Sequence, residues 1–158
     1  MEQTYYLKEA IIFNPTGKKH NAIATVATMK EIRQNKDQFY FNFEKNYKEN
    51  TVYKITKEGD DVIQAFVSVQ PVIDVLKCSN METNKINKSP LSIHGGIGKS
   101  IIALCCKISF DMGFDGYIAF EAKTNLFNYY TRYGAKRIGG LKMYVDTKAA
   151  KKLVDIYF

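Results

Sequence analysis

The sequence predicts an α/β protein in which helices flank one mixed central sheet. A glycine-rich turn at residues 95–98 opens a helix whose apolar residues recur at helical spacing up to Met112. A short apolar strand, Tyr117–Phe120, follows, so the preceding strand, this helix and the new strand make a parallel crossover unit. Hairpin signals at 52–69 and 135–146 add antiparallel strands to the sheet.

The size and composition are those of one folded domain, which we expect over residues 1–158. The chain is 46% hydrophobic and 25% charged. No apolar run approaches the ~20 residues that span a bilayer, so a membrane is not an expected partner. The net charge of +7 favours acidic partners such as nucleic acid or a polyphosphate cofactor, although the lysines are spread along the chain as on solvated faces.

The cysteines indicate a reduced, cytoplasmic protein. Cys78, Cys105 and Cys106 are odd in number and lack metal-ligand spacing, so we expect buried free thiols. His20 and His94 are the only histidines, so no metal site is expected.

In the N-terminal half, β-branched and aromatic residues predict a strand over Tyr5–Phe13. Apolar residues partly on one face predict a helix over residues 21–36. The phenylalanines at 39, 41 and 43 alternate with polar residues as in a strand, but helix and loop stay open for this segment. An antiparallel hairpin follows at 52–69, and then an extended segment, Val72–Cys78.

In the C-terminal half, residues 80–90 are polar and are expected to form a loop that leads into the glycine turn. After the crossover unit, Leu126 and three tyrosines define a shorter helix that Gly134 ends. Extended segments around Gly139–Gly140 form a hairpin. Thr147–Tyr157 has lysines on one side and apolar residues on the other, which predicts a closing helix.

The glycine turn offers unpaired backbone N–H groups at the positive end of the helix dipole, where glycine lets a ligand approach the backbone. This geometry suits a phosphate or pyrophosphate, although an ordinary loop that caps a core helix has the same pattern. The candidate binding residues are Gly95, Gly96, Ile97, Gly98, Lys99 and Ser100.

Two phosphate-binding motifs compete for this turn. Gly98–Ser100 matches the end of a P-loop, but Ile93 stands where the first glycine of that motif is required, and a polar segment with Pro90 replaces the usual hydrophobic strand. The acyl-CoA loop of the GNAT acetyltransferases, Gln/Arg-x-x-Gly-x-Gly/Ala, is matched by Gly96 and Gly98 but not by Ile93. The residues after the turn favour the second motif.

From Gly95 onward the order of features resembles a GNAT acetyltransferase, and this resemblance implies a GNAT-like acyl-CoA N-acyltransferase fold. The hairpin at 52–69 fits the same fold. Leu126–Ala135 resembles the family's Asn…Leu-Tyr-x-x-x-Gly-Phe signature, with Ala135 in the place of phenylalanine. The other matching features are the Gly96-x-Gly98 loop, the helix ending at Gly113–Phe114, the strand Tyr117–Ala122, Asn125 and the Gly139–Gly140 hairpin.

The resemblance implies acetyl-CoA as the cofactor. Backbone amides of Gly96–Ser100 would hold its pyrophosphate, and Lys99 could add charge. The pantetheine arm would lie between the strands near Val75–Cys78 and Tyr117–Glu121, which splay apart in this family. Asn125 would hydrogen-bond near that arm.

The resemblance also implies direct transfer, in which a neutral amine attacks the thioester and backbone N–H groups of the first splayed strand stabilise the oxyanion. Tyr130, four residues before Gly134, is the candidate acid that protonates the leaving thiolate. A core tyrosine is an equal interpretation, because Tyr130 lies one turn from Leu126 on the apolar face. The general base is not identified, and Glu82 and Glu121 are its candidates. A nucleophilic role for Cys78 is not expected without a neighbouring histidine, and His94 is expected in a loop near the phosphates.

We therefore predict an N-acetyltransferase that transfers an acetyl group from acetyl-CoA to a small-molecule or protein amine; a homodimer is an open possibility. The alternative is a catalytically weak or inactive GNAT-fold module that binds CoA or nucleic acid. Lys45–Lys48 is the one faint basic and aromatic segment, so nucleic acid is not the expected partner. The acceptor stays undetermined, because the variable N-terminal half builds the acceptor pocket in this family.

Overall fold

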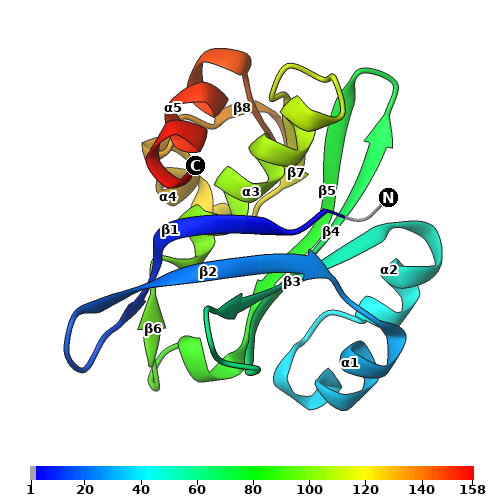
Figure 1. Ribbon diagram of the computed structural model, residues 1–158. Coiled ribbons are helices and arrows are strands. Elements are labelled where there is room, and N and C mark those ends of the chain that lie inside the picture. The colour runs from blue at the N-terminus through cyan, green and yellow to red at the C-terminus, as the bar shows by residue number, and fades with distance from the viewer. Residues whose placement is uncertain (1–2) are drawn as a thin grey trace.

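The computed structural model describes residues 3–158, apart from the side chain of Thr124. Figure 1 shows a curved sheet with α3, α4 and α5 gathered on one side and α1 and α2 on the other. None of the helices in the described residues is both long enough and apolar enough to cross a membrane. The elements are β1 (Tyr5–Phe13), β2 (Lys18–Val26), α1 (Met29–Gln34), η1 (Lys36–Gln38), α2 (Phe43–Glu49), β3 (Thr51–Lys57), β4 (Ile63–Val72), β5 (Val75–Thr83), η2 (Lys85–Asn87), β6 (His94–Gly95), α3 (Ile97–Asp111), β7 (Ile118–Glu121), η3 (Thr124–Leu126), α4 (Phe127–Arg132), β8 (Lys136–Gly139), β9 (Lys142–Val145) and α5 (Thr147–Tyr157).

The described strands form a nine-stranded mixed sheet in the order β6-β1-β2-β3-β4-β5-β7-β9-β8. The β5–β7 pair is parallel, and α3 is the crossover that connects its two strands. All other neighbouring pairs are antiparallel. The predicted crossover unit and both predicted hairpins are therefore confirmed.

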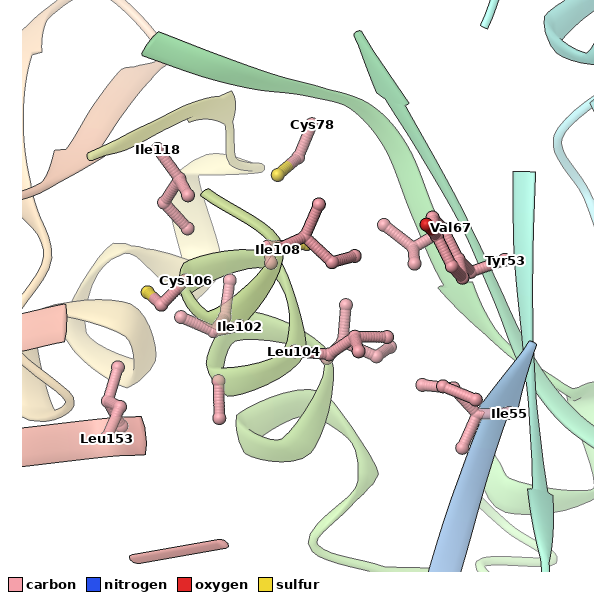
Figure 2. Close-up of a cluster of buried hydrophobic side chains, with 14 of the residues drawn as sticks. Tyr53, Ile55, Val67, Cys78, Ile102, Leu104, Cys106, Ile108, Ile118 and Leu153 are labelled. Carbon is pink, nitrogen blue, oxygen red and sulfur yellow. The ribbon is translucent and has the colours of Figure 1, made fainter. Parts of the chain in front are cut away.

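Two apolar layers cover the sheet because neighbouring strand residues point to opposite faces. On β4, Val67 joins the main core with α3 and α5, whereas Phe66 joins a smaller cluster with α1 and α2. Figure 2 shows side chains of α3 between residues of the sheet, such as Ile55 and Val67, and Leu153 of α5. The central helix is thus buried on nearly all sides.

The central helix agrees with the prediction over most of its length. It ends at Asp111, and Gly113 follows with a φ of +85°, the left-handed conformation expected after a last turn. Met112, predicted on the apolar face, is instead 47% exposed, because the helix has already ended there.

The helix predicted over 21–36 is wrong in its first half. Residues 18–26 form strand β2, in which Ala22 and Ala24 are fully buried at the two-residue spacing of a strand. The helix begins only after Thr28, whose side chain accepts from the Glu31 N–H while the Glu31 carboxylate accepts from the Thr28 N–H. Pairing with β1 and β3 overrides the helix propensity of this segment.

Two further segments differ from or complete the sequence analysis. The loop predicted over 80–90 begins only after Thr83, because residues 80–83 pair with residues 65–68 of β4. The phenylalanine segment left open at 39–43 is irregular and leads into α2, with Phe39 and Phe43 buried in the smaller cluster. The alternation of phenylalanines therefore reflects packing against Phe66 rather than a strand.

Candidate functional site

Strands β5 and β7 diverge in the middle of the sheet. They pair only from Leu76 with Ile118 to Cys78 with Phe120. A bulge then follows in β5, since Cys78 lies opposite Val69 but Asn80 lies opposite the next β4 residue, Ser68. From residue 79 to 83 the outer edge of β5 has no strand partner among the described residues, while β7 continues beside β9.

The glycine turn lies at the start of α3 with its first amides unpaired within the helix. Gly96 is the N-cap with a φ of +78°, and a Cβ there would lie 3.1 Å from the Ala10 carbonyl oxygen. Only glycine fits this backbone and this close approach. The N–H of Ser100 is the first to bond back to the Gly96 carbonyl, so the N–H groups of residues 97–99 lie at the positive end of the dipole.

Tyr129 of α4 lies directly over this turn, and the sequence analysis did not single it out. Its hydroxyl accepts a hydrogen bond from the Lys99 N–H. A Cβ on Gly98 would lie 2.5 Å from that hydroxyl oxygen, so Gly98 has no room for a side chain. Burial, followed by the neighbouring Tyr133 and Tyr130, raises the pKa of Tyr129 to about 12, so its phenol stays protonated.

The remaining turn residues divide between backbone and side-chain roles. Ile97 is buried, and the buried Ser100 hydroxyl donates to the Ala10 and Gly96 carbonyls at 2.8 Å. The side chains of Ile97 and Ser100 are therefore not available to bind a ligand. Gly95 belongs to β6 and pairs with Ile12 of β1. Lys99 extends its Nζ toward the rings of Tyr133 and Tyr157, 5.1 and 5.8 Å from their centroids.

Asn125 is exposed in the short turn η3, which follows the carboxyl end of β7. In parallel units this end of the strand is where ligands gather. The structure therefore brings the start of α3, the end of β7 and the divergence of β5 into one region.

Tyr130 lies at the gap between the diverging strands. Its ring packs edge-on against Phe120 of β7 with centroids 5.0 Å apart, and its hydroxyl donates to the Met81 sulfur of β5 at 3.9 Å. Burial, with a smaller contribution from Cys105, raises the pKa of the phenol. The side chain therefore packs as a core residue does, while its protonated hydroxyl faces the unpaired stretch of β5.

The three thiols are buried and free, as the sequence predicts. Cys78 of β5 points toward α3 (Figure 2), where it shares a hydrogen bond with Cys105. This hydrogen bond and burial raise the pKa of Cys105 well above its usual value, and burial does the same for Cys106. A nucleophile must be a thiolate, so protonated buried thiols suit packing rather than catalysis.

Neither carboxylate considered as a general base has the surroundings that role requires. Glu82 is buried in β5, where it accepts from the Tyr40 and Phe41 N–H groups at 2.9 Å and pairs with Lys88. Its lone pairs are therefore in use. Glu121 is exposed at the end of β7, opposite Lys142.

His94 lies in strand β6 beside Phe13, not in a loop. Its Nδ1 lies 2.8 Å from the Asn87 side-chain oxygen, and burial, followed by Lys57 and His20, lowers its pKa. Within the described residues no three histidine, cysteine, aspartate or glutamate side chains gather as metal ligands would.

Comparison with solved structures identifies this architecture. The chain resembles the ribosomal-protein-S18-alanine N-acetyltransferase from Escherichia coli, with a TM-score of 0.60 and 13% identity over 78% of this chain and 92% of that one. It also resembles a chimera of the spermidine N-acetyltransferase SpeG from Vibrio cholerae and hSSAT, with a TM-score of 0.61 and 9% identity over 83% and 98% of the two chains. An acyl-CoA N-acyltransferase from Pseudomonas aeruginosa gives a TM-score of 0.57 and 11% identity over 92% and 99%.

The protein thus has the fold of the GNAT acyl-CoA N-acyltransferases, and the resemblance inferred from the sequence is confirmed at the level of the fold. No protein-family model and no curated protein sequence matches the chain.

Proposed function

We propose that the protein is an N-acetyltransferase that transfers an acetyl group from acetyl-CoA to an amine of a small molecule or protein. The observation that carries this proposal is the convergence of three features: unpaired amides at the start of α3, the divergence of β5 from β7, and the Tyr130 hydroxyl at the gap. An elongated ligand with a phosphate group and a thin arm fits these features together.

The residues present fit acetyl-CoA, which when bound supplies an acetyl thioester. Of the N–H groups within Gly96–Ser100, those of Ile97 and Gly98 would hold the pyrophosphate, because the Lys99 N–H already donates to Tyr129 and the Ser100 N–H to the Gly96 carbonyl. Lys99 adds a positive charge near the same turn, and Asn125 stands at the end of β7 near the arm. We place the three free thiols, and hence the protein, in a reducing, cytoplasmic setting.

In the proposed reaction the unpaired N–H groups on the β5 edge stabilise negative charge that develops on the carbonyl oxygen. Tyr130 gives its hydroxyl proton to the departing sulfur, a role that its position at the gap supports, and its raised pKa keeps the hydroxyl protonated until then. Its tyrosine ring is held by Phe120, which fixes the direction of the hydroxyl.

A second candidate is a GNAT-fold module with weak or no transfer activity. It is favoured by the absence of an available base among the carboxylates considered, since the Glu82 oxygens already bind two backbone N–H groups and Lys88. Ile93, which departs from the acyl-CoA loop pattern, points the same way.

Thermal unfolding with and without ligands tests the proposal. Acetyl-CoA at ~100 times its Kd stabilises the protein by about 2.7 kcal/mol and so raises the Tm, whereas ATP with magnesium leaves the Tm unchanged. A Tm rise with ATP–magnesium and none with acetyl-CoA would refute the proposed cofactor. Release of free CoA on addition of an amine then separates an active enzyme from the inactive module.

A further inference from the structure

The hydroxyl of Tyr129 reaches the glycine turn from α4 and takes part in its hydrogen bonding. It accepts from the Lys99 N–H, and its oxygen lies 2.5 Å from where a Cβ of Gly98 would stand. The signature that Leu126–Ala135 resembles has leucine before its tyrosine, and Tyr129 stands at that position here. This chain therefore brings a polar group to the turn where the signature has an apolar one.

The Tyr129 hydroxyl has a proton to give. A phenol can accept one hydrogen bond and donate another. Tyr129 accepts from Lys99, while no group in the described residues accepts the proton of the Tyr129 hydroxyl. Burial raises the pKa of this phenol to about 12, so it is neutral near pH 7 and stays a donor. An ionised phosphate oxygen is the kind of acceptor that such a donor binds strongly.

Ring packing fixes the direction in which this hydroxyl points. The rings of Tyr130 and Tyr133 pack edge-on against the Tyr129 ring, with centroids 5.2 and 5.1 Å away. A side chain that is held before the ligand arrives loses little conformational entropy when the ligand binds. The packing therefore favours a hydroxyl that keeps its place beside a bound anion over one that swings away.

The hydroxyl also lies close to the amides that remain free for a phosphate. Within the helix the Ser100 N–H is the first to bond back, so the N–H groups of Ile97 and Gly98 have no helical partner. A Cβ on Gly98 would share its Cα with the Gly98 N–H, which puts the hydroxyl oxygen within about 5 Å of that nitrogen. Since a phosphate presents several oxygens, one phosphate can accept from both amides and from the phenol.

From these observations we propose that Tyr129 is a cofactor-binding residue whose hydroxyl donates a hydrogen bond to the pyrophosphate of CoA. This inference rests on the proposed function. The Lys99 N–H then acts through the phenol, because the hydrogen bond that it donates polarises the O–H toward the phosphate. Lys99 supplies charge near the turn, whereas Tyr129 supplies a hydrogen bond of fixed direction.

Calorimetric titration with CoA tests the inference. Tyr129→Phe removes only the hydroxyl and keeps the ring packing, and we expect it to raise the Kd for CoA about tenfold, as the loss of one hydrogen bond to a charged group does. Dephospho-CoA, which lacks the 3′-phosphate but keeps the pyrophosphate, should show the same fold change. Tyr133→Phe is the matched control and should leave both Kd values unchanged, since Tyr133 belongs to the same helix and ring cluster but its hydroxyl makes no hydrogen bond to the turn in the described residues.

Failure of this inference differs from failure of the proposed function. If CoA does not bind the unmodified protein, the proposed function is refuted and this inference falls with it. If CoA binds and Tyr129→Phe leaves its Kd unchanged or lowers it, the inference alone is refuted, and a lower Kd would show that the hydroxyl competes with the phosphate for the Lys99 N–H. An equal loss in Tyr133→Phe, or a loss with CoA that is absent with dephospho-CoA, would also overturn it.

Discussion

Replacing Gly98 by alanine tests whether Tyr129 covers the glycine turn. The new Cβ would lie 2.5 Å from the Tyr129 hydroxyl oxygen and 3.2 Å from the Cζ atom. Overpacking of this kind costs ~1–3 kcal/mol, and the displaced hydroxyl loses its hydrogen bond from Lys99, which is worth ~1 kcal/mol. Alanine regains ~1 kcal/mol through helix propensity, so we expect a net loss of ~1–3 kcal/mol in the free energy of unfolding.

In a Tyr129→Phe background the same change meets no hydroxyl, and the nearest contact is the ring carbon at 3.2 Å. We therefore expect Gly98→Ala to be nearly neutral there, which gives a coupling energy of ~1 kcal/mol or more in the double-mutant cycle. Urea denaturation of the four proteins measures it, and calorimetric titration with CoA follows binding. Equal destabilisation in both backgrounds would show that Tyr129 does not lie over Gly98.

Two further predictions concern catalysis and pH. Tyr130→Phe keeps the packed ring, so stability and CoA binding change little, while turnover with a known acceptor falls by about 10²–10⁴-fold. Tyr133→Phe is the control. Near-normal turnover of the Tyr130→Phe enzyme would show that Tyr130 has no role in the mechanism. Asp146 caps α5 by accepting from the Ala149 N–H, which together with Lys136 lowers its pKa from 3.8. Because the folded-state pKa is depressed, its stabilisation is present above pH ~4 and lost as pH falls through the folded value. Asp146→Ala should cost ~1 kcal/mol by urea denaturation at pH 7 and progressively less below pH ~4, and a cost independent of pH would contradict this role.

The sequence by itself determined the elements whose signals are local. The glycine turn, the apolar period of α3 and the left-handed Gly113 fix where that helix begins and ends. Gly140, with a φ of +55°, lies in the two-residue turn that joins β8 to β9, and the amphipathic pattern predicts α5. In each case the residues that specify the conformation belong to the same turn or helix as the residues that adopt it, so neighbouring residues suffice to predict the element.

Pairing between distant strands decided what local patterns could not. The local sequence predicts a helix over residues 21–26 and a loop over residues 80–83. Both segments are strands instead, because residues 21–26 pair with β1 and β3 and residues 80–83 pair with β4. Buried backbone N–H and C=O groups need hydrogen-bond partners, which β2 finds on both edges and residues 80–83 find on β4, and this need outweighs a propensity of a few tenths of a kcal/mol per residue.

The candidate site depends on contacts that join residues far apart in the sequence. The Tyr130 hydroxyl meets Met81, 49 residues earlier, and Glu82 binds the N–H of Tyr40, 42 residues earlier. The sequence analysis identified the glycine turn and Tyr130 because they belong to a motif, but it gave no sign that Tyr129 lies over Gly98. Such contacts follow from strand register and from how helices lie on the sheet, and only the assembled tertiary structure sets both.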